Sequence, residues 1–264
     1  MKKTETILIN CKGPVATIIL NRPAVHHAMN LVMIRELTEA FSSFDKDPGI
    51  RIILLRSTGE HFCAGADLNW MKEGMQHSEM QLKKESMELA RLFSLMTSNS
   101  CIILTAVSGK VIGGAIGLVA ASDLVLADAS AQFSFSEVKL GMVPATIAPH
   151  VVSRAGKRKA AAWMISGRRF NSEEARWAGL IDLLCETGHL EEESSRILED
   201  LLTGGPEAMA GIKEMLMHFD FGLDADTTIE KSAEILAHFR TSAEGQEGMK
   251  AFLEKRKTAW NGKG

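Results

Sequence analysis

The chain has 264 residues, which is enough for one large domain or for one domain with a small appendage. Its 30 basic and 33 acidic residues leave a net charge of −3, so no strong field indicates nucleic acid or an anionic membrane as a partner. Hydrophobic residues make up 45% of the sequence, but no apolar run is long enough to span a membrane and none near the start suits a secretory signal, so we expect a cytoplasmic location.

The first half of the chain is predicted to alternate strands with helices. Short apolar or alternating runs predict strands at residues 6–11, 15–20, 51–55, 101–107, 124–126 and 132–135. Helical spacing of apolar residues predicts helices at residues 30–44, 76–96 and 113–121. Asn30 stands directly before the first of these helices and is the expected N-cap.

The second half reads differently, because the pattern after Pro149 is almost entirely helical. Helices are predicted at residues 157–165, 172–178, 190–202, 207–217, 225–239 and 243–257. The only strand expected there is a short one around residues 181–185. Strands with crossover helices followed by helices alone predict an α/β core with a helical C-terminal part, and the repeated strand–helix units suggest a spiral.

The four cysteines carry no sign of a metal site. They stand at positions 11, 63, 101 and 185, form no CxxC pair and have no histidines at metal-ligand spacing. We expect four buried, reduced thiols and no bound metal.

Two glycine-bearing loops, residues 61–70 and 108–117, each follow a predicted strand. Small residues let a ligand approach the backbone closely. At Gly113-Gly114 the chain enters a predicted helix, whose first amides lack internal partners and suit an anion or a developing oxyanion. Close packing of helix on strand explains the glycines equally well. Neither phosphate-loop pattern, GxxxxGK[ST] or GxGxxG, is present.

Five segments together carry a resemblance to a known family. They are Leu20–Pro23, Phe62–Leu68, Gly113–Ala115, Ser136–Gly141 and Glu247–Arg256. In order and spacing, over essentially the whole chain, they resemble the crotonase family, the enoyl-CoA hydratase/isomerase superfamily. Residues 65–72 and 137–151 are most similar to bacterial 3-methylglutaconyl-CoA hydratase-like members.

The resemblance implies a crotonase-like α/β fold. Residues 1–200 would form a spiral of ββα units, and residues 201–264 a helical region that serves trimerisation and covers the CoA site. The implied partners are an acyl-CoA thioester as substrate and further copies of the chain, in a homotrimer or a dimer of trimers. Coenzyme A then arrives as part of the substrate, and no separate cofactor is expected.

The resemblance also implies which groups carry the chemistry. The amides of Ala66 and Gly114 would form an oxyanion hole, and Glu137 would move protons. When a proton leaves or joins the carbon beside a thioester, negative charge builds on the carbonyl oxygen. Two fixed donors stabilise that enolate more than the uncharged thioester.

One departure from the family pattern bears on the choice between reactions. Family hydratases usually carry a second glutamate three residues after the second glycine of the oxyanion loop, where this chain has Gly117. We expect hydration of a 2-enoyl-CoA, including a branched 3-methylglutaconyl type, and a water in the space at Gly117 would support this reaction. Double-bond isomerisation by Glu137 alone is the first alternative, and binding of CoA thioesters with little turnover is the second.

Other residues bear on these alternatives. Ala145 stands where dienoyl-CoA isomerases carry an aspartate, and the chain has no tyrosine for a hydroxycinnamoyl-CoA hydratase-lyase. Decarboxylation stays open, because it too passes through an enolate. Asn69, Thr146 or His150 are the candidates for a second polar group in the site.

The resemblance gives further residues a place around the substrate. The candidates that border coenzyme A or the acyl group are Val25, His26, Ala64, Asp67, Leu68, Trp70, Gly113, Gly117, Met142, Pro144, Phe252 and Lys255. Asp67 is better explained as an N-cap of the following turn, and Trp70 almost as well by core packing. Phe252 and Lys255 lie three apart on the predicted last helix, hence on one face, where the lysine either meets a CoA phosphate or belongs to a solvated basic surface. His27 stands where many family members have asparagine.

Overall fold

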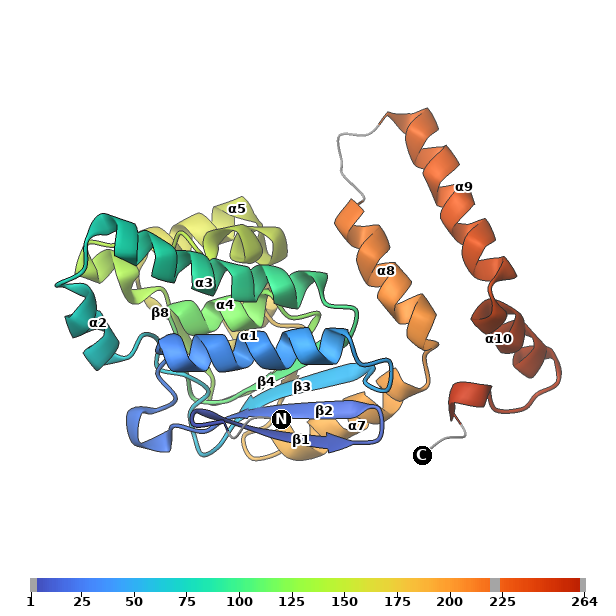
Figure 1. The fold of residues 1–264 in the computed structure, drawn as a ribbon, viewed down its shortest axis with the longest axis horizontal. Coiled ribbons are helices and arrows are strands. Elements are labelled where there is room, and N and C mark those ends of the chain that lie inside the picture. Colours follow the sequence, from blue (N-terminus) through green and yellow to red (C-terminus); the bar gives the residue numbers. More distant parts are fainter. Residues whose placement is uncertain (1–3, 219–223, 262–264) are drawn as a thin grey trace. The chain divides into compact units, whose positions relative to one another are not determined.

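The computed structural model describes residues 4–218 and 224–261. The chain divides into two compact units, one ending at Ser194 and one beginning at Ser195 (Figure 1). The division falls inside α7 (Leu190–Leu202). The first unit is mixed α/β and the second is helical, in the order that the sequence predicted.

A six-stranded sheet forms the centre of the first unit, in the order β1-β2-β3-β4-β6-β9. Its strands are β1 (Ile7–Lys12), β2 (Val15–Leu20), β3 (Ile52–Ser57), β4 (Ile102–Val107), β6 (Leu124–Asp128) and β9 (Leu183–Cys185). β1 pairs antiparallel with β2, and every later pair is parallel. All of β4 is buried, as expected for a parallel strand covered on both faces.

A second sheet is smaller and was largely missed by the sequence reading. It contains β5 (Lys110–Ile112), β7 (Gln132–Ser134) and β8 (Arg169–Asn171), with β5 parallel and β8 antiparallel to β7. β5 and β8 were not predicted, and β8 corrects the expectation of a single strand after Pro149. Strands of three residues show too little alternation to be recognised, so their pairing depends on contacts that are distant in sequence.

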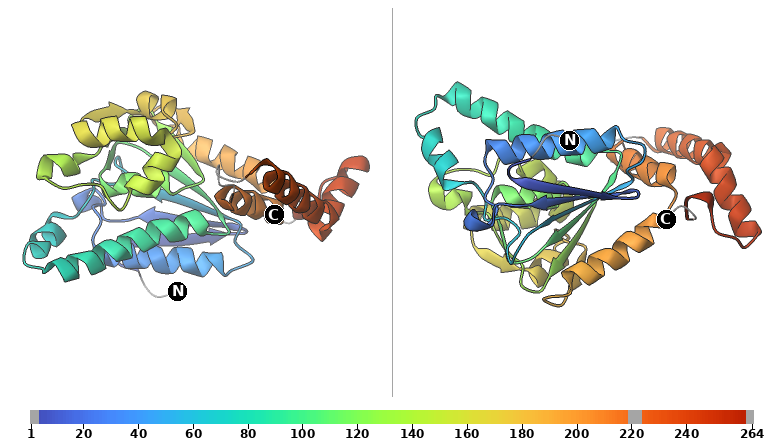
Figure 2. Two further views of the ribbon diagram at one scale, coloured as in Figure 1. Left: turned by 90° about the horizontal axis from the view of Figure 1, so that it is seen from above. Right: turned by 60° about the horizontal axis from the view of Figure 1, so that its bottom comes forward.

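The helices of the first unit lie around its strands (Figures 1 and 2). They are α1 (Leu31–Asp45), α2 (Leu68–Gly74), α3 (Glu79–Ser98), α4 (Gly114–Ala120), α5 (Ala148–Ser166) and α6 (Ser172–Trp177). The predicted N-cap is confirmed, because the Asn30 side chain accepts a hydrogen bond from the Met33 amide at 3.0 Å. α5 starts well before the predicted helix and bends at Gly156, which has φ 75°.

The cysteines correct one expectation. Cys63 and Cys101 are buried and Cys185 is half-buried, but Cys11 is exposed on the edge strand β1. Edge strands leave alternate side chains in solvent, which explains the difference. Burial raises the pKa of the Cys63 thiol to about 12, so this thiol is inert packing.

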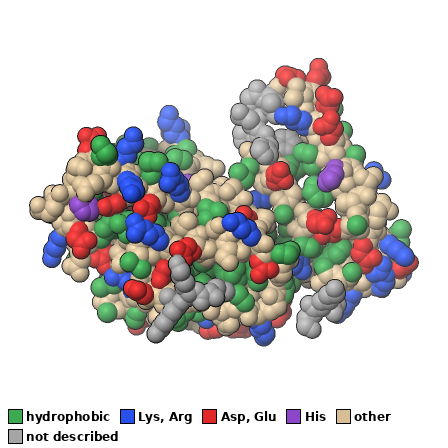
Figure 3. Space-filling model, in the orientation of Figure 1, with side chains coloured by type: hydrophobic (Ala, Val, Ile, Leu, Met, Phe, Trp, Pro, Cys, Tyr) green, Lys and Arg blue, Asp and Glu red, His purple; other side chains and the backbone are tan. Residues whose placement is uncertain are grey.

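The second unit contains α8 (Pro206–His218), α9 (Ala225–Thr241) and α10 (Ala243–Leu253). The Glu244 carboxylate accepts hydrogen bonds from the amides of Glu207 and Ala208, at 2.9 and 2.8 Å, and so caps the start of α8. No helix in the described part of either unit is long and apolar enough to cross a bilayer. On the face shown in Figure 3, acidic and basic side chains are interspersed, as the small net charge suggests.

The last helix ends earlier than predicted, at Leu253 and not at residue 257. Lys255 has φ 53°, its amide donates to the Phe252 carbonyl, and the Arg256 amide donates to the Ala251 carbonyl at 3.0 Å. This pattern is a Schellman C-cap, with lysine at the left-handed position usually taken by glycine. Phe252 and Lys255 therefore do not share a helical face.

Candidate active site

The loop at residues 61–67 is held by two neighbouring segments. On one side it pairs with β5: the Cys63 amide donates to the Lys110 carbonyl at 2.9 Å, and the Ile112 amide donates to the Cys63 carbonyl at 3.1 Å. On the other side a parallel bridge joins Met29 to Ala66. The two glycine-bearing loops that the sequence singled out are thus adjacent in the fold.

Ala66 lies in the middle of the second bridge. The Met29 amide donates to the Gly65 carbonyl at 2.7 Å, and the Asp67 amide donates to the Met29 carbonyl at 2.8 Å. In a parallel pair, a residue flanked by two such bonds directs its own amide to the opposite side. The Ala66 amide accordingly has no acceptor among residues 4–218 and 224–261, and Ala66 is exposed.

The second free amide belongs to Gly114, the first residue of α4. Gly113 precedes it with φ 54° and donates its own amide to the Ser134 carbonyl at 2.9 Å. This left-handed backbone favours glycine, and it turns the chain so that the next amide begins a helix without an internal acceptor. No bond from the Gly114 amide is found within the described part of the chain.

Met29 contacts both loops, a role that the sequence did not reveal. Its backbone holds Ala66 as described, and a Cβ added to Gly114 would lie 2.7 Å from its Cε methyl group. The side chain is 2% exposed. One buried methionine therefore sets the positions of the segments that carry both free amides.

Glu137 lies in the short 3₁₀ turn Ser136–Leu140, directly against the Gly113 backbone. A Cβ added to Gly113 would lie 3.0 Å from Glu137 Oε1. The other oxygen, Oε2, is buried and has no hydrogen-bond partner among the described residues. Burial without a nearby cation raises the pKa of the Glu137 carboxyl above its ordinary value. A carboxylate in this state is suited to take up and return protons.

Gly117 does not open onto space for water. A Cβ at this position would overlap Phe93 and would lie 2.5 Å from the Cγ2 atom of Ile147, and both of these side chains are fully buried. Apolar packing therefore occupies the region where the sequence reading placed a water in lieu of a second carboxylate.

None of the three candidate second polar groups has a hydrogen bond with Glu137 in the described residues. His150 packs its ring edge against Phe93, with centroids 5.9 Å apart, and its Nδ1 lies 3.2 Å from the Thr97 hydroxyl. Burial lowers the pKa of His150, so its ring is held neutral. Asn69 is exposed and Thr146 is half-buried, and neither side chain has a hydrogen bond with Glu137. Among the described residues, Glu137 is the only one near the free amides with a buried carboxylate oxygen that lacks a hydrogen-bond partner.

Asp67 has the structural role that was expected. Its Oδ1 atom accepts hydrogen bonds from the amides of Asn69 and Trp70, at 2.7 and 3.3 Å, and so caps α2. Its Oδ2 atom pairs with Arg22 Nη2 at 2.8 Å. Burial alone would raise the pKa of Asp67, but the Arg22 guanidinium and the two amides outweigh it and lower the pKa. Leu68 is largely exposed at the start of α2.

Trp70 and the residues after Glu137 provide apolar surface. Trp70 packs partly against the core, and its indole N–H donates to Glu85 Oε2 at 2.8 Å. The Met142 amide donates to the Glu137 carbonyl at 3.0 Å, while its side chain is exposed; Pro144 is half-buried.

Val25 and His26 belong to the loop between β2 and α1, which is hydrogen-bonded to the residues before Ala66. Val25 is exposed, and the His26 carbonyl accepts a hydrogen bond from the Ala64 amide at 2.9 Å. The His26 ring is exposed and meets the His61 ring edge-on, with centroids 4.7 Å apart. A hollow of about 120 Å³ opens here, lined by Pro23, His26, His27, Thr58, Gly59, Glu60 and His61.

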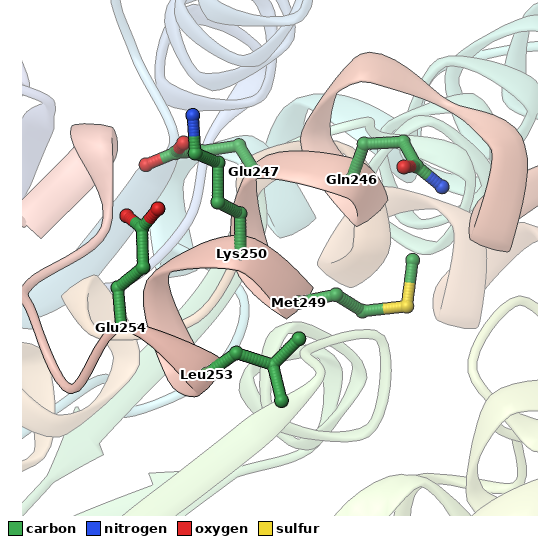
Figure 4. Close-up of a pocket in the computed structure, with 6 residues that line it drawn as sticks. All are labelled: Gln246, Glu247, Met249, Lys250, Leu253 and Glu254. Carbon is green, nitrogen blue, oxygen red and sulfur yellow. The ribbon is translucent and has the colours of Figure 1, made fainter.

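The two candidates near the end of the chain belong to the second unit. Phe252 is 83% exposed, and Lys255 is exposed after the end of α10. A shallow hollow of about 610 Å³ lies along α10 and is lined by Gln246, Glu247, Met249, Lys250, Leu253 and Glu254. Figure 4 shows Met249 and Leu253 on one side of this helix, away from the charged side chains.

Comparison with known proteins places this chain among similar sequences and folds. A family model described as enoyl-CoA hydratase/isomerase matches residues 10–263. The crystal structure of an enoyl-CoA hydratase from Shewanella pealeana has a TM-score of 0.94 at 34% identity, covering 98% of this chain and 97% of that one. The mitochondrial enoyl-CoA hydratase of Pongo abelii is 31% identical over 92% of this chain and 82% of its own length. The trans-2-decenoyl-[acyl-carrier-protein] isomerase of Streptococcus mutans is 27% identical over 98% of this chain and 99% of its own length.

The expected crotonase-like α/β fold with a helical C-terminal region is thereby confirmed. The names of these three relatives include both hydratases and an isomerase, and none of them names a 3-methylglutaconyl substrate.

Proposed function

Because this chain belongs to the enoyl-CoA hydratase/isomerase family, we propose that it acts on the double bond of an enoyl-CoA thioester with Glu137 as its single acid–base group. The observation that carries the proposal is the Glu137 carboxylate, which lies against Gly113, one residue before the Gly114 amide. Its Oε2 atom is buried and has no hydrogen-bond partner in the part of the chain that the structure describes. The amides of Ala66 and Gly114 donate to the thioester oxygen. Coenzyme A belongs to the substrate, and no other cofactor takes part.

Both proposed donors are backbone groups on segments fixed by hydrogen bonds, so they require no rearrangement when charge develops. Removing one donor of this kind typically costs about 3–4 kcal/mol of transition-state stabilisation. The raised pKa of Glu137 serves both directions of proton transfer, because a carboxyl group that is too acidic returns a proton reluctantly.

Hydration is the favoured reaction. Glu137 takes a proton from a water molecule as the water oxygen attacks C3, and the electron pair of the double bond moves onto the thioester oxygen. The enolate then collapses, and C2 takes the proton back from Glu137, so that one water adds across the bond. The names of the Shewanella and Pongo relatives support this choice. A branched 3-methylglutaconyl chain is the proposed substrate type.

Isomerisation of a 3-enoyl-CoA is the second candidate, and the packing at Gly117 favours it. Phe93 and Ile147 leave no room for a second carboxylate or for a water at that position. Glu137 would remove a proton from C2, and the resulting dienolate would take it back at C4, which moves the double bond into conjugation. The name of the Streptococcus relative supports this reaction type.

Self-association of the chain is proposed from the second unit. Its helices expose the apolar side chains of Ile212, Leu216, Met217, Ile229, Leu236, Met249, Phe252 and Leu253. So many exposed apolar residues on about seventy residues of chain are typical of an interface. A homotrimer or a dimer of trimers is the proposed assembly.

Turnover of crotonyl-CoA, 3-methylglutaconyl-CoA and a 3-enoyl-CoA in ¹⁸O-labelled water tests the function. Labelled 3-hydroxyacyl product that requires Glu137 supports hydration, whereas a 2-enoyl product without label from the 3-enoyl substrate supports isomerisation. Glu137→Gln is the test variant, and Glu186→Gln, at an exposed position, is its matched control. Thioester-induced thermal stabilisation with no chemistry on any substrate would instead leave a binding protein with little turnover.

A further inference from the structure

His27 is a buried histidine that the proposed reaction does not use. It is 2% exposed and lies in the loop between β2 and α1. The Arg22 amide donates to His27 Nδ1 at 2.9 Å, and His27 Nε2 lies 2.7 Å from the Thr58 carbonyl oxygen. Since an amide can only donate and a carbonyl only accept, the ring is neutral, with its proton on Nε2.

The backbone at this point has an unfavourable conformation for its residues. His26 and His27 have φ 48° and 56°, the left-handed region that non-glycine residues rarely occupy. Such a conformation persists only where its surroundings hold it in place. The two hydrogen bonds of the His27 ring stabilise this conformation, because they join the loop to Arg22 and to Thr58, the residue that directly follows β3.

Arg22 closes the same loop from its other side. Its guanidinium donates to the Ala28 carbonyl through Nη1 and pairs with Asp67 Oδ2 through Nη2 at 2.8 Å. Its own carbonyl accepts a hydrogen bond from the His27 amide at 2.9 Å. Arg22 is therefore bonded to the loop through its amide, its carbonyl and its guanidinium, and it is also paired with the residue that follows Ala66.

The loop leads directly to Met29. The Met29 backbone holds Ala66 in place through hydrogen bonds with Gly65 and Asp67, and its methyl group lies against Gly114. The His26 carbonyl also accepts a hydrogen bond from the Ala64 amide, two residues before Ala66. Residues 22–29 thus supply the hydrogen bonds and the ion pair that hold residues 64–67 on this side, as far as the described residues show.

We propose that Arg22 and His27 are positioning residues for the reaction, acting through Met29 to aim the amides of Ala66 and Gly114 at the thioester oxygen. This inference rests on the proposed function. Neither side chain contacts the reacting atoms, so the expected signature is a fall in kcat at nearly constant KM. An amide that is displaced weakens the transition state more than the bound substrate.

Protonation of His27 would break the arrangement. A proton on Nδ1 removes the acceptor for the Arg22 amide, and the new charge faces Arg22, His26 and His61, while the Glu60 carboxylate lines the same hollow. Burial lowers the pKa of His27, the hydrogen bond to the Thr58 carbonyl opposes this, and His26, His61 and Arg22 lower it further, so the net pKa is lowered and the neutral ring is favoured. We therefore expect the hydrogen bond between the Arg22 amide and the His27 ring to be lost only at acidic pH.

The experiment compares the full-length wild type with His27→Ala, His27→Asn, Arg22→Lys and the control His189→Asn, which makes the same substitution at an exposed histidine. Circular dichroism and thermal unfolding establish that each variant is folded. The readouts are kcat and KM on the best substrate of the panel above, and the pH profile of kcat. Glu137→Gln is run alongside.

We expect His27→Ala to lower kcat at least tenfold with KM changed less than threefold. His27→Asn should recover most of this loss, because its side-chain oxygen can still accept from the Arg22 amide, and its acid limb should be shallower than that of the wild type. Arg22→Lys, which keeps the charge but loses the forked contact, should also lower kcat, and it decides the question if His27→Ala does not fold.

Wild-type kcat in both His27→Ala and Arg22→Lys would overturn the inference, as would a rise in KM with kcat unchanged, which would assign the loop to substrate binding alone. These results differ from failure of the proposed function, in which the wild type itself has no activity that depends on Glu137.

Discussion

The stability of a Gly117→Ala variant tests whether Phe93 and Ile147 fill the space beside Gly117 in α4. A Cβ there would lie 2.5 Å from Ile147 Cγ2 and 2.8 Å from Phe93 Cε1, inside the buried core. In an open space the change would stabilise the protein by about 0.5–1 kcal/mol, because alanine is the better helix former. In the packed space we expect the opposite sign, a loss of about 1–3 kcal/mol.

A double-mutant cycle with Phe93→Ala locates the cause. Phe93→Ala alone should cost about 3–5 kcal/mol through the cavity that it leaves. The alanine methyl group at position 117 then loses its overlap with Phe93 and keeps only the contact with Ile147. The double variant should therefore be more stable than the sum of the single effects by about 1–2 kcal/mol, within the range for residues in contact. Gly74→Ala is the matched control, because a Cβ there meets Leu82 at an ordinary 3.5 Å.

Urea unfolding followed by tryptophan fluorescence, at one protein concentration for all variants, gives the free energies of unfolding. A Gly117→Ala protein as stable as the wild type, or an additive double variant, would refute the packing argument. A water beside Gly117 would then again be available to the reaction.

Three further predictions concern stability and assembly. Glu137→Gln should stabilise the fold at neutral pH. Because the folded-state pKa of Glu137 is raised, its contribution to stability is fully present below the unfolded value near 4.5 and is lost as pH rises through the folded value. The prediction is contradicted if the wild type and the variant have equal free energies of unfolding both at pH 7 and at pH 4. Asp67→Ala should lower the free energy of unfolding by about 1 kcal/mol or more through loss of the α2 cap. Asp200→Ala, at an exposed position, is the control, and an unchanged urea midpoint in Asp67→Ala would count against the capping role. Leu216→Glu on α8 should reduce the mass measured by light scattering from that of an oligomer to that of the monomer, and a wild-type chain that is already monomeric would remove the proposed interface.

The fold was predictable to the extent that its elements carry their own signals. β2 was predicted residue for residue, and α1 was predicted with its N-cap, because alternation and a capping side chain are local features. β5 and β8 were missed because three residues contain almost no periodicity. The end of α10 was missed because Lys255 takes a backbone conformation for which glycine is the usual sign.

The candidate site divides in the same way. Its glycine loops and Glu137 could be found by motif, and the capping role of Asp67 by its place before a turn. Met29, Arg22 and His27 act through contacts between segments distant in sequence, which no local pattern encodes. The filling of the space at Gly117 by Phe93 and Ile147 likewise became visible only in three dimensions.

The central claim is that Glu137 alone transfers the proton at the carbon beside the thioester. Exchange of the C2 protons of butyryl-CoA in D₂O tests it most directly, because this saturated thioester can form the enolate but can undergo neither hydration nor isomerisation. The account predicts exchange by the wild type and by Glu186→Gln, and a rate lower by about 10²–10⁴-fold in Glu137→Gln. Exchange at the wild-type rate in Glu137→Gln would contradict it.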